Sequence, residues 1–134
     1  MNNGDTLKKI MYVDDDPDML DIVSLGLKMG DYTVKACGSG REAIDIIASF
    51  QPDLVMLDML MPVMSGMATL KELHKVPGFE AVPAVFLTGK VNKKQLDAYK
   101  ALGAIGVINK PLNPLKLAGV VSTLWDKSRP GKSS

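Results

Sequence analysis

The sequence has a single cysteine, a single histidine and almost no net charge, and each of these scarcities excludes a class of function. With Cys37 alone among 134 residues, the chain can form no intramolecular disulfide and no cysteine-based metal site. The formal charge of +1 gives no electrostatic basis for binding nucleic acid or an acidic membrane surface. His74 has no partner motif for catalysis or metal binding. The binding chemistry must therefore be local and carried by other residues.

Long hydrophobic runs are missing as well. No apolar stretch approaches the roughly 18 residues needed to span a bilayer, and the N-terminal MNNGDTLKK lacks the apolar segment of a signal peptide. We therefore expect no membrane insertion and a cytoplasmic location. A chain of 134 residues can bury one ordinary core but is too short for two. We expect one domain over residues 1–126 and a loose tail over residues 127–134.

Short apolar runs alternate with longer amphipathic segments five times, which is typical of βα units. The apolar runs lack polar alternation, as expected when helices cover both faces of a parallel sheet. The expected strands are Lys9–Val13, Tyr32–Ala36, Asp53–Leu57, Ala84–Leu87 and Ile105–Ile108. The pattern predicts an α/β fold with a doubly wound five-stranded parallel sheet.

Helix start signals lie between these runs. Four of the five combine a capping side chain with a following proline, or with Glu or Gln three residues later. The expected openings are Asp16 with Pro17, Ser39 with Glu42, a segment around Gly66–His74, Asn92 with Gln95, and Asn113 with Pro114.

Polar residues follow four of the predicted strands. They are Asp14 and Asp15 after the first, Asp58 after the third, Thr88 after the fourth and Lys110 just beyond the fifth. In open parallel sheets, ligands bind outside these carboxyl ends, near the point where strand order reverses. Three carboxylates suit a hard divalent cation such as Mg²⁺, while lysine and threonine can bind phosphate oxygens. An aspartate can also carry phosphate as an acyl phosphate, and Asp58 is the candidate because it lies alone at the central strand's end.

The run of aspartates after the first strand divides into two roles. Two carboxylates about 4 Å apart repel by roughly 4 kcal/mol at an effective dielectric near 20, so Asp14 and Asp15 need a compensating cation. Asp16 instead precedes Pro17 as an N-cap, and Asp18 lies in the first helical turn, where a negative charge interacts favourably with the helix dipole.

These residues also belong to longer motifs. The pair Asp14-Asp15, LDMLMPVMSG at 57–66, FLTG at 86–89 and NKP at 109–111 occur in the order and spacing of the receiver domains of bacterial response regulators. The chain resembles this two-component signalling family, typified by CheY-like proteins, over almost its whole length. The resemblance implies a flavodoxin-like (βα)5 fold with strand order 2-1-3-4-5.

The resemblance also implies a phosphoryl-transfer site. Asp58 would accept a phosphoryl group from a phosphohistidine on a partner protein. Asp15 and Asp58 would ligate Mg²⁺ or Mn²⁺ together with the backbone carbonyl of Leu60, and Asp14 would act through a metal-bound water. No organic cofactor is implied, and the protein would be a phosphoacceptor rather than a turnover enzyme.

Further roles follow from the later motifs. Thr88 would contact the phosphoryl group, and Lys110 would pair with it, directed by a cis Lys110–Pro111 bond. Val107 stands where many family members have Tyr or Phe, which argues against a switch built on a rotating ring and leaves a loop movement led by Thr88. Leu60 matches a position that in this family lies beside the route of the hydrolytic water. A leucine there cannot orient a water, which predicts slow self-dephosphorylation.

The implied partners are a sensor histidine kinase or a histidine phosphotransfer protein, together with a downstream protein whose identity is unknown. The downstream contact would use the surface of the fourth helix, fifth strand and fifth helix. A phosphorylation-dependent homodimer is left open, and direct binding to nucleic acid is not expected.

Three alternatives also stay open. The chain is either a stand-alone receiver, which we favour, or a fragment of a larger regulator whose output domain is missing. A haloacid-dehalogenase-like phosphatase also uses a strand-end aspartate and Mg²⁺, but it needs a second acid two residues later, where this chain has Leu60. The third alternative is a receiver-like scaffold that binds partners without being phosphorylated.

Overall fold

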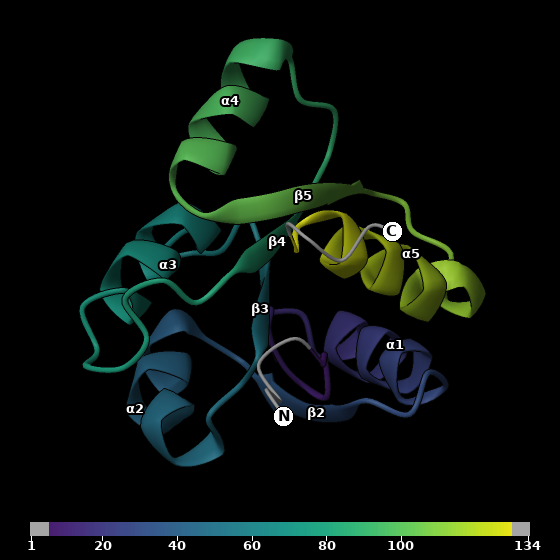
Figure 1. Ribbon diagram of the computed structural model, residues 1–134, viewed down its shortest axis with the longest axis horizontal. Helices are drawn as coiled ribbons and strands as arrows, with labels where there is room; N and C mark the ends of the chain where they lie inside the picture. Colours follow the sequence, from purple (N-terminus) through teal and green to yellow (C-terminus); the bar gives the residue numbers. More distant parts are fainter. Residues whose placement is uncertain (1–5, 130–134) are drawn as a thin grey trace.

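The computed structural model describes residues 6–129 and contains a five-stranded parallel sheet (Figure 1). The strands are β1 (Lys9–Val13), β2 (Thr33–Cys37), β3 (Leu54–Asp58), β4 (Ala84–Thr88) and β5 (Ala104–Asn109). Their order is β2-β1-β3-β4-β5, which confirms the expected order. The chain passes from β1 to β2 at one edge and then returns to place β3 on the other side of β1. The carboxyl ends of β1 and β3 therefore flank the point where strand order reverses.

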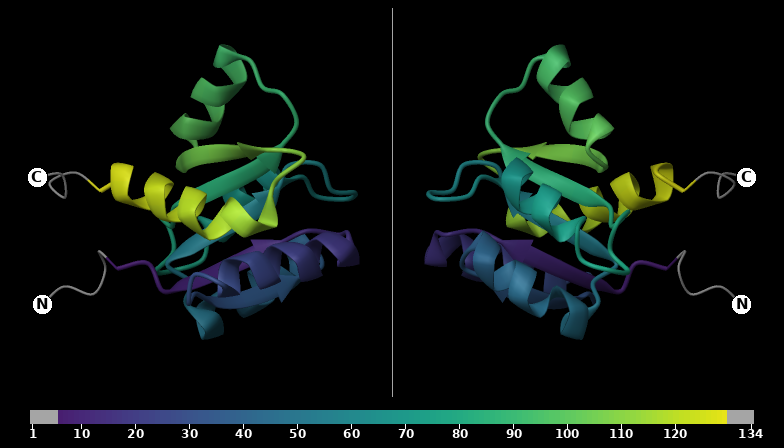
Figure 2. Two further views of the ribbon diagram at one scale, coloured as in Figure 1. Left: turned by 90° about the vertical axis from the view of Figure 1, so that its right-hand side faces the viewer. Right: turned by 90° about the vertical axis from the view of Figure 1, so that its left-hand side faces the viewer.

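Five helices cover the two faces of this sheet. They are α1 (Pro17–Lys28), α2 (Gly40–Phe50), α3 (Gly66–Leu73), α4 (Lys93–Ala101) and α5 (Pro114–Lys127). Figure 2 shows α1 and α5 side by side on one face, with α2 and α3 on the other and α4 beside β5. No helix among residues 6–129 is both long enough and apolar enough to cross a membrane.

The core forms two clusters, one on each face of the sheet. Because successive strand residues point to opposite faces, Met11 and Val13 of β1 join the cluster under α2 and α3, whereas Ile10 and Tyr12 join the cluster under α1 and α5. All residues of β3 and β4 are buried. Burial on both faces explains why the apolar runs show no polar alternation.

Most of the predicted helix starts are confirmed. Asn92 and Gln95 form a reciprocal capping box at α4, and the Asn113 side chain accepts a hydrogen bond from the Leu115 N–H at α5. At α2 the predicted box is wrong in one half. The Ser39 hydroxyl accepts from the Glu42 N–H, but the Glu42 carboxylate accepts from the Gly38 N–H rather than from Ser39.

Four strands differ from their predicted bounds at one or both ends. Asp53 is not part of β3, because its carboxylate accepts hydrogen bonds from the backbone N–H groups of Lys8 and Lys9 at 3.0 and 2.9 Å. At the other end, β3 and β4 continue through Asp58 and Thr88, which pair with Leu87 and Asn109 of the neighbouring strands. These two polar residues are therefore held by the sheet rather than by flexible loops.

The chain beyond the sheet is helical as far as Lys127, with Ser128 as the C-cap of α5. The helix therefore includes the first residue of the predicted tail. Residues 130–134 of that tail lie outside the described residues.

Candidate functional site

Three aspartates meet at the point where strand order reverses. Asp14 and Asp15 directly follow β1, and Asp58 ends the adjacent strand β3. One carboxylate oxygen from each residue lies within 4.8 Å of those from the other two. Asp14 and Asp58 are 1% and 3% exposed, whereas Asp15 is exposed, so the cluster opens to solvent on the side of Asp15. The carboxylates expected to lie together do so.

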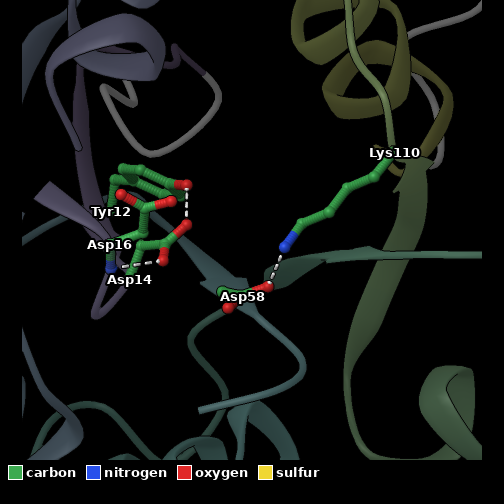
Figure 3. Close-up of polar contacts among 5 residues, drawn as sticks. All are labelled: Tyr12, Asp14, Asp16, Asp58 and Lys110. Carbon is green, nitrogen blue, oxygen red and sulfur yellow. Dashed lines mark hydrogen bonds and ion pairs between the residues drawn. The ribbon is translucent and has the colours of Figure 1, made fainter. Parts of the chain in front are cut away.

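Asp14 is held by hydrogen bonds on both carboxylate oxygens (Figure 3). The Tyr12 hydroxyl donates to Oδ2 at 2.5 Å, and the Asp16 backbone N–H donates to Oδ1 at 3.0 Å. The Asp14 N–H donates to the carbonyl of Cys37 at 3.0 Å, which ties the backbone to β2. Asp14 is therefore fixed by neighbours on three sides.

Sequence reasoning missed Tyr12, because it lies inside the apolar run of the first strand, next to more strongly polar candidates. A signal was present, since residues two apart on a strand point to the same face and Tyr12 precedes Asp14 by two. Burial, followed by the hydrogen bond to Asp14, raises the pKa of the Tyr12 hydroxyl. The hydroxyl therefore remains a neutral donor to the carboxylate.

Lys110 is the cationic partner of the cluster. Its Nζ donates to Asp58 Oδ1 at 2.5 Å, and its side chain is 35% exposed (Figure 3). The Lys110 N–H donates to the carbonyl of Thr88 at 2.8 Å, which anchors the lysine to the end of β4. The Lys110–Pro111 bond is cis, as the resemblance implied.

The Asp58 carboxyl group has an environment that opposes its ionisation. Burial raises its pKa most, the hydrogen bond from Lys110 lowers it, and the negative charge of Asp14 raises it again. The net shift is upward despite the lysine. One lysine therefore does not fully offset the desolvation and the repulsion between acids, and a further cation would stabilise the ionised cluster.

This shift predicts how folding stability depends on pH. A carboxyl whose pKa is raised by folding stabilises the protein below its unfolded pKa of about 4 and loses that contribution as pH rises through the folded value. We expect the free energy of unfolding of the metal-free protein to fall between pH 4 and 8 relative to that of Asp58→Asn. Urea unfolding of both proteins in chelator measures the difference, and a difference that is flat or rises with pH would contradict it.

Thr88 and Leu60, the two remaining predicted site residues, differ in exposure. Thr88 ends β4 beside the strand that carries Asp58, and it is 9% exposed. Leu60 follows Asp58 by two residues, and its side chain is 80% exposed. An exposed leucine beside an acidic cluster offers its backbone carbonyl but no side-chain hydrogen bond.

The loop between β3 and α3 packs closely against Asp58. A Cβ atom on Gly66 would lie 2.5 Å from the carbonyl oxygen of Asp58, a distance that real Cβ atoms do not tolerate. The Gly66 N–H donates to the carbonyl of Met59 at 3.0 Å. Only glycine lets the start of α3 approach the end of β3 this closely.

Comparison with known families assigns the chain. The family model for the response regulator receiver domain matches residues 10–122, which include the three acids and Lys110. The chain belongs to this family. The expected resemblance is thereby confirmed, and the protein is a receiver domain of the two-component response regulators.

The receiver domain also resembles regions of larger curated proteins. It is 39% identical over 119 residues to a probable cyclic di-GMP phosphodiesterase of Vibrio cholerae, covering 88% of this chain and 27% of that protein. It is 30% identical over 118 residues to the DNA-binding response regulator MtrA of Mycolicibacterium smegmatis, covering 87% and 50%. The chain thus spans about a quarter to a half of these relatives' lengths.

Solved structures agree with the fold. The receiver domain matches the chemotaxis protein CheY4 of Vibrio cholerae with a TM-score of 0.81 at 28% identity, covering 89% of this chain and 99% of that one. A putative response regulator from Chloroflexus aurantiacus matches with a TM-score of 0.78 at 27% identity, covering 92% and 100%. The CheY-like, flavodoxin-like fold expected from the sequence is confirmed.

Proposed function

We propose that this receiver domain takes a phosphoryl group onto Asp58 from the phosphohistidine of a sensor kinase or phosphotransfer protein. The observation that supports this most is the setting of Asp58, a buried carboxylate with Lys110 on one oxygen and two further carboxylates nearby. The free oxygen of Asp58 would form the new P–O bond while the P–N bond of the phosphohistidine breaks. The imidazole would keep the electron pair of that bond.

The donor set fits a hard divalent cation. The Asp58 and Asp15 carboxylates would ligate Mg²⁺, or Mn²⁺, with the backbone carbonyl of Leu60, and Asp14 would act through a bound water. Three carboxylates facing one lysine leave an excess of negative charge. Burial first, and then the charge of Asp14, raises the pKa of Asp58 despite that lysine. Bound Mg²⁺ would offset this charge and that of the incoming phosphoryl oxygens.

Lys110 and Thr88 would hold the transferred group. Lys110 now binds an Asp58 oxygen and, by a small movement of Nζ, would pair with a phosphoryl oxygen instead. The Thr88 hydroxyl, at the adjacent strand end, would donate to another phosphoryl oxygen. Because the Lys110 N–H donates a hydrogen bond to the Thr88 carbonyl, a movement of one residue would displace the other.

The phosphorylated state would act by changing a protein-binding surface. A shift of the segment after Thr88 would alter the face made by α4, β5 and α5, which would control a downstream protein or homodimer formation. Val107 pairs with Phe86 in the sheet and supplies no ring that could rotate. The movement would therefore centre on the loop between β4 and α4.

Two arrangements of the whole protein are compatible with this role. One is a stand-alone receiver, and the other is a receiver joined to an output domain. The chain covers 99% of CheY4 but only 27% of the phosphodiesterase and 50% of MtrA, so relatives of both lengths match it. The family match gives no support to a haloacid-dehalogenase-like phosphatase. A phosphorylation-independent scaffold is distinguished by the experiment below.

Intact-protein mass spectrometry after incubation with acetyl phosphate and Mg²⁺ tests the proposal. We expect one added phosphoryl group, located on Asp58 by peptide mapping and absent when the metal is chelated. External phosphomonoesters should not be turned over. A protein that gains no mass, or that is labelled at another residue, would contradict the proposal and favour the scaffold.

The lifetime of the phosphoryl group gives a further prediction. An exposed leucine at position 60 cannot orient an attacking water, so we expect Leu60→Asn to lose its label several-fold faster than the wild type. Decay is followed by mass spectrometry after removal of the phosphodonor. Leu60→Met is the control, because it keeps the size and apolar character of the side chain. If Leu60→Asn and the wild type lost the label at the same rate, Leu60 would not be the cause of slow dephosphorylation.

A further inference from the structure

Tyr12 is a buried polar residue that the proposed chemistry leaves without a role. It is the last residue but one of β1, between Ala36 of β2 and Met56 of β3, and is fully buried in the cluster under α1 and α5. Its hydroxyl reaches the carboxyl end of the strand, where it donates to Asp14 (Figure 3). The ring is held by the core and the hydroxyl by the site.

The hydrogen bonds at Asp14 fix the orientation of its carboxylate. Tyr12 occupies one lone pair of Oδ2, and the Asp16 N–H occupies one lone pair of Oδ1. Both donors are immobile, because the Tyr12 ring is packed and Asp16 caps α1 through the N–H of Asp18. Each Asp14 oxygen keeps a second lone pair whose direction is thereby set.

Water cannot easily replace the tyrosine. Asp14 is 1% exposed, so an apolar residue at position 12 would fill the core but leave Oδ2 buried without that donor. The carboxylate would then keep only the hydrogen bond from the Asp16 N–H and could turn about it. Because Asp14 would act on the cation through a bound water, Tyr12 would orient the carboxylate that accepts from that water. Outer partners of this kind affect metal affinity.

We propose that Tyr12 is a positioning residue that sets the divalent-cation affinity of the acidic cluster by fixing the Asp14 carboxylate. This inference rests on the proposed function, because it requires that the cluster bind a cation.

Isothermal titration of Mg²⁺ into Tyr12→Phe tests the inference. We expect the Kd to rise about tenfold, at the low end of such effects because the Asp16 N–H still holds the other oxygen. Tyr32→Phe is the matched control. The Tyr32 ring packs against the same cluster, but the residue directly precedes β2 and so lies at the opposite end of the strands from Asp14. The Kd of this variant should stay unchanged. A Tyr12→Phe Kd within twofold of wild type, or a tighter one, would overturn the inference.

A double-mutant comparison separates positioning from a general loosening of the core. In an Asp14→Ala background, where Asp15 and Asp58 remain to bind Mg²⁺ weakly, adding Tyr12→Phe should cause no further loss in an NMR titration. The same loss in that background would show that the hydroxyl does not act through Asp14. A wild-type protein that binds no divalent cation would instead contradict the proposed function itself, so the two failures are distinguishable.

Discussion

Asp58→Asn is expected to abolish labelling by acetyl phosphate in the presence of Mg²⁺. The substitution keeps the shape of the side chain but replaces an anionic oxygen with a neutral amide, which cannot form an acyl phosphate. Label should disappear entirely from the intact-mass spectrum, whereas Asp45→Asn on the exposed face of α2 should be labelled as the wild type is. If Asp58→Asn were still labelled, the phosphoacceptor would have to be another residue.

The loss in Asp58→Asn should not reflect unfolding. The wild-type carboxyl group is buried, and burial and the charge of Asp14 both oppose its ionisation. Removing a charge from such a place relieves repulsion, although it also removes the ion pair with Lys110. A cooperative urea transition for the variant at neutral pH would establish that it is folded.

Asp15→Asn should weaken Mg²⁺ binding far more than Asp16→Asn. A divalent ion loses the attraction of one carboxylate at close range, and after partial compensation by hydration we expect about 3 kcal/mol, or roughly a hundredfold in Kd. Asp15 is exposed, so its replacement should leave the fold intact. Titration calorimetry with Mg²⁺ measures both variants.

Asp16→Asn is the matched control, because the same chemical change falls one position later. Asp16 serves as the N-cap of α1, where its Oδ1 accepts from the Asp18 N–H at 2.9 Å, and asparagine caps a helix about as well. The Asp16 N–H that holds Asp14 is also retained. We expect a change in Kd below about twofold. Equal losses in the two variants would disprove the division of roles among these aspartates.

The local pattern of the sequence was enough to predict the elements of the fold. Apolar runs of strand length and capping residues such as Asp16 and Asn92 depend on interactions within a few residues, which sequence displays directly. Where a predicted boundary was wrong, a distant partner decided it. Asp53 leaves β3 because its carboxylate binds the backbone of Lys8 and Lys9, more than forty residues earlier. The order of the strands came from the family resemblance, not from periodicity.

The site was predictable to the extent that it follows from where strands end. That rule brought Asp14, Asp15 and Asp58 together, because parallel strands share one carboxyl edge. It could not predict the contact of Lys110 with Asp58. The two residues are 52 positions apart in the sequence, and their contact depends on the course of the chain after β5. Tyr12 was missed for a different reason, since its ring is a core residue and only its hydroxyl belongs to the site.

The close approach of Gly66 to Asp58 affects how harmful substitutions in this chain should be interpreted. A side chain at position 66 would collide with the main chain of Asp58 itself, although glycine contributes no group to the chemistry. In a survey of variants, position 66 would thus resemble a reactive residue by its intolerance alone. Substitutions at position 66 fail for steric reasons, whereas substitutions at Asp58 remove a reacting group. Only a direct measurement of metal binding or of acyl phosphate would distinguish the two.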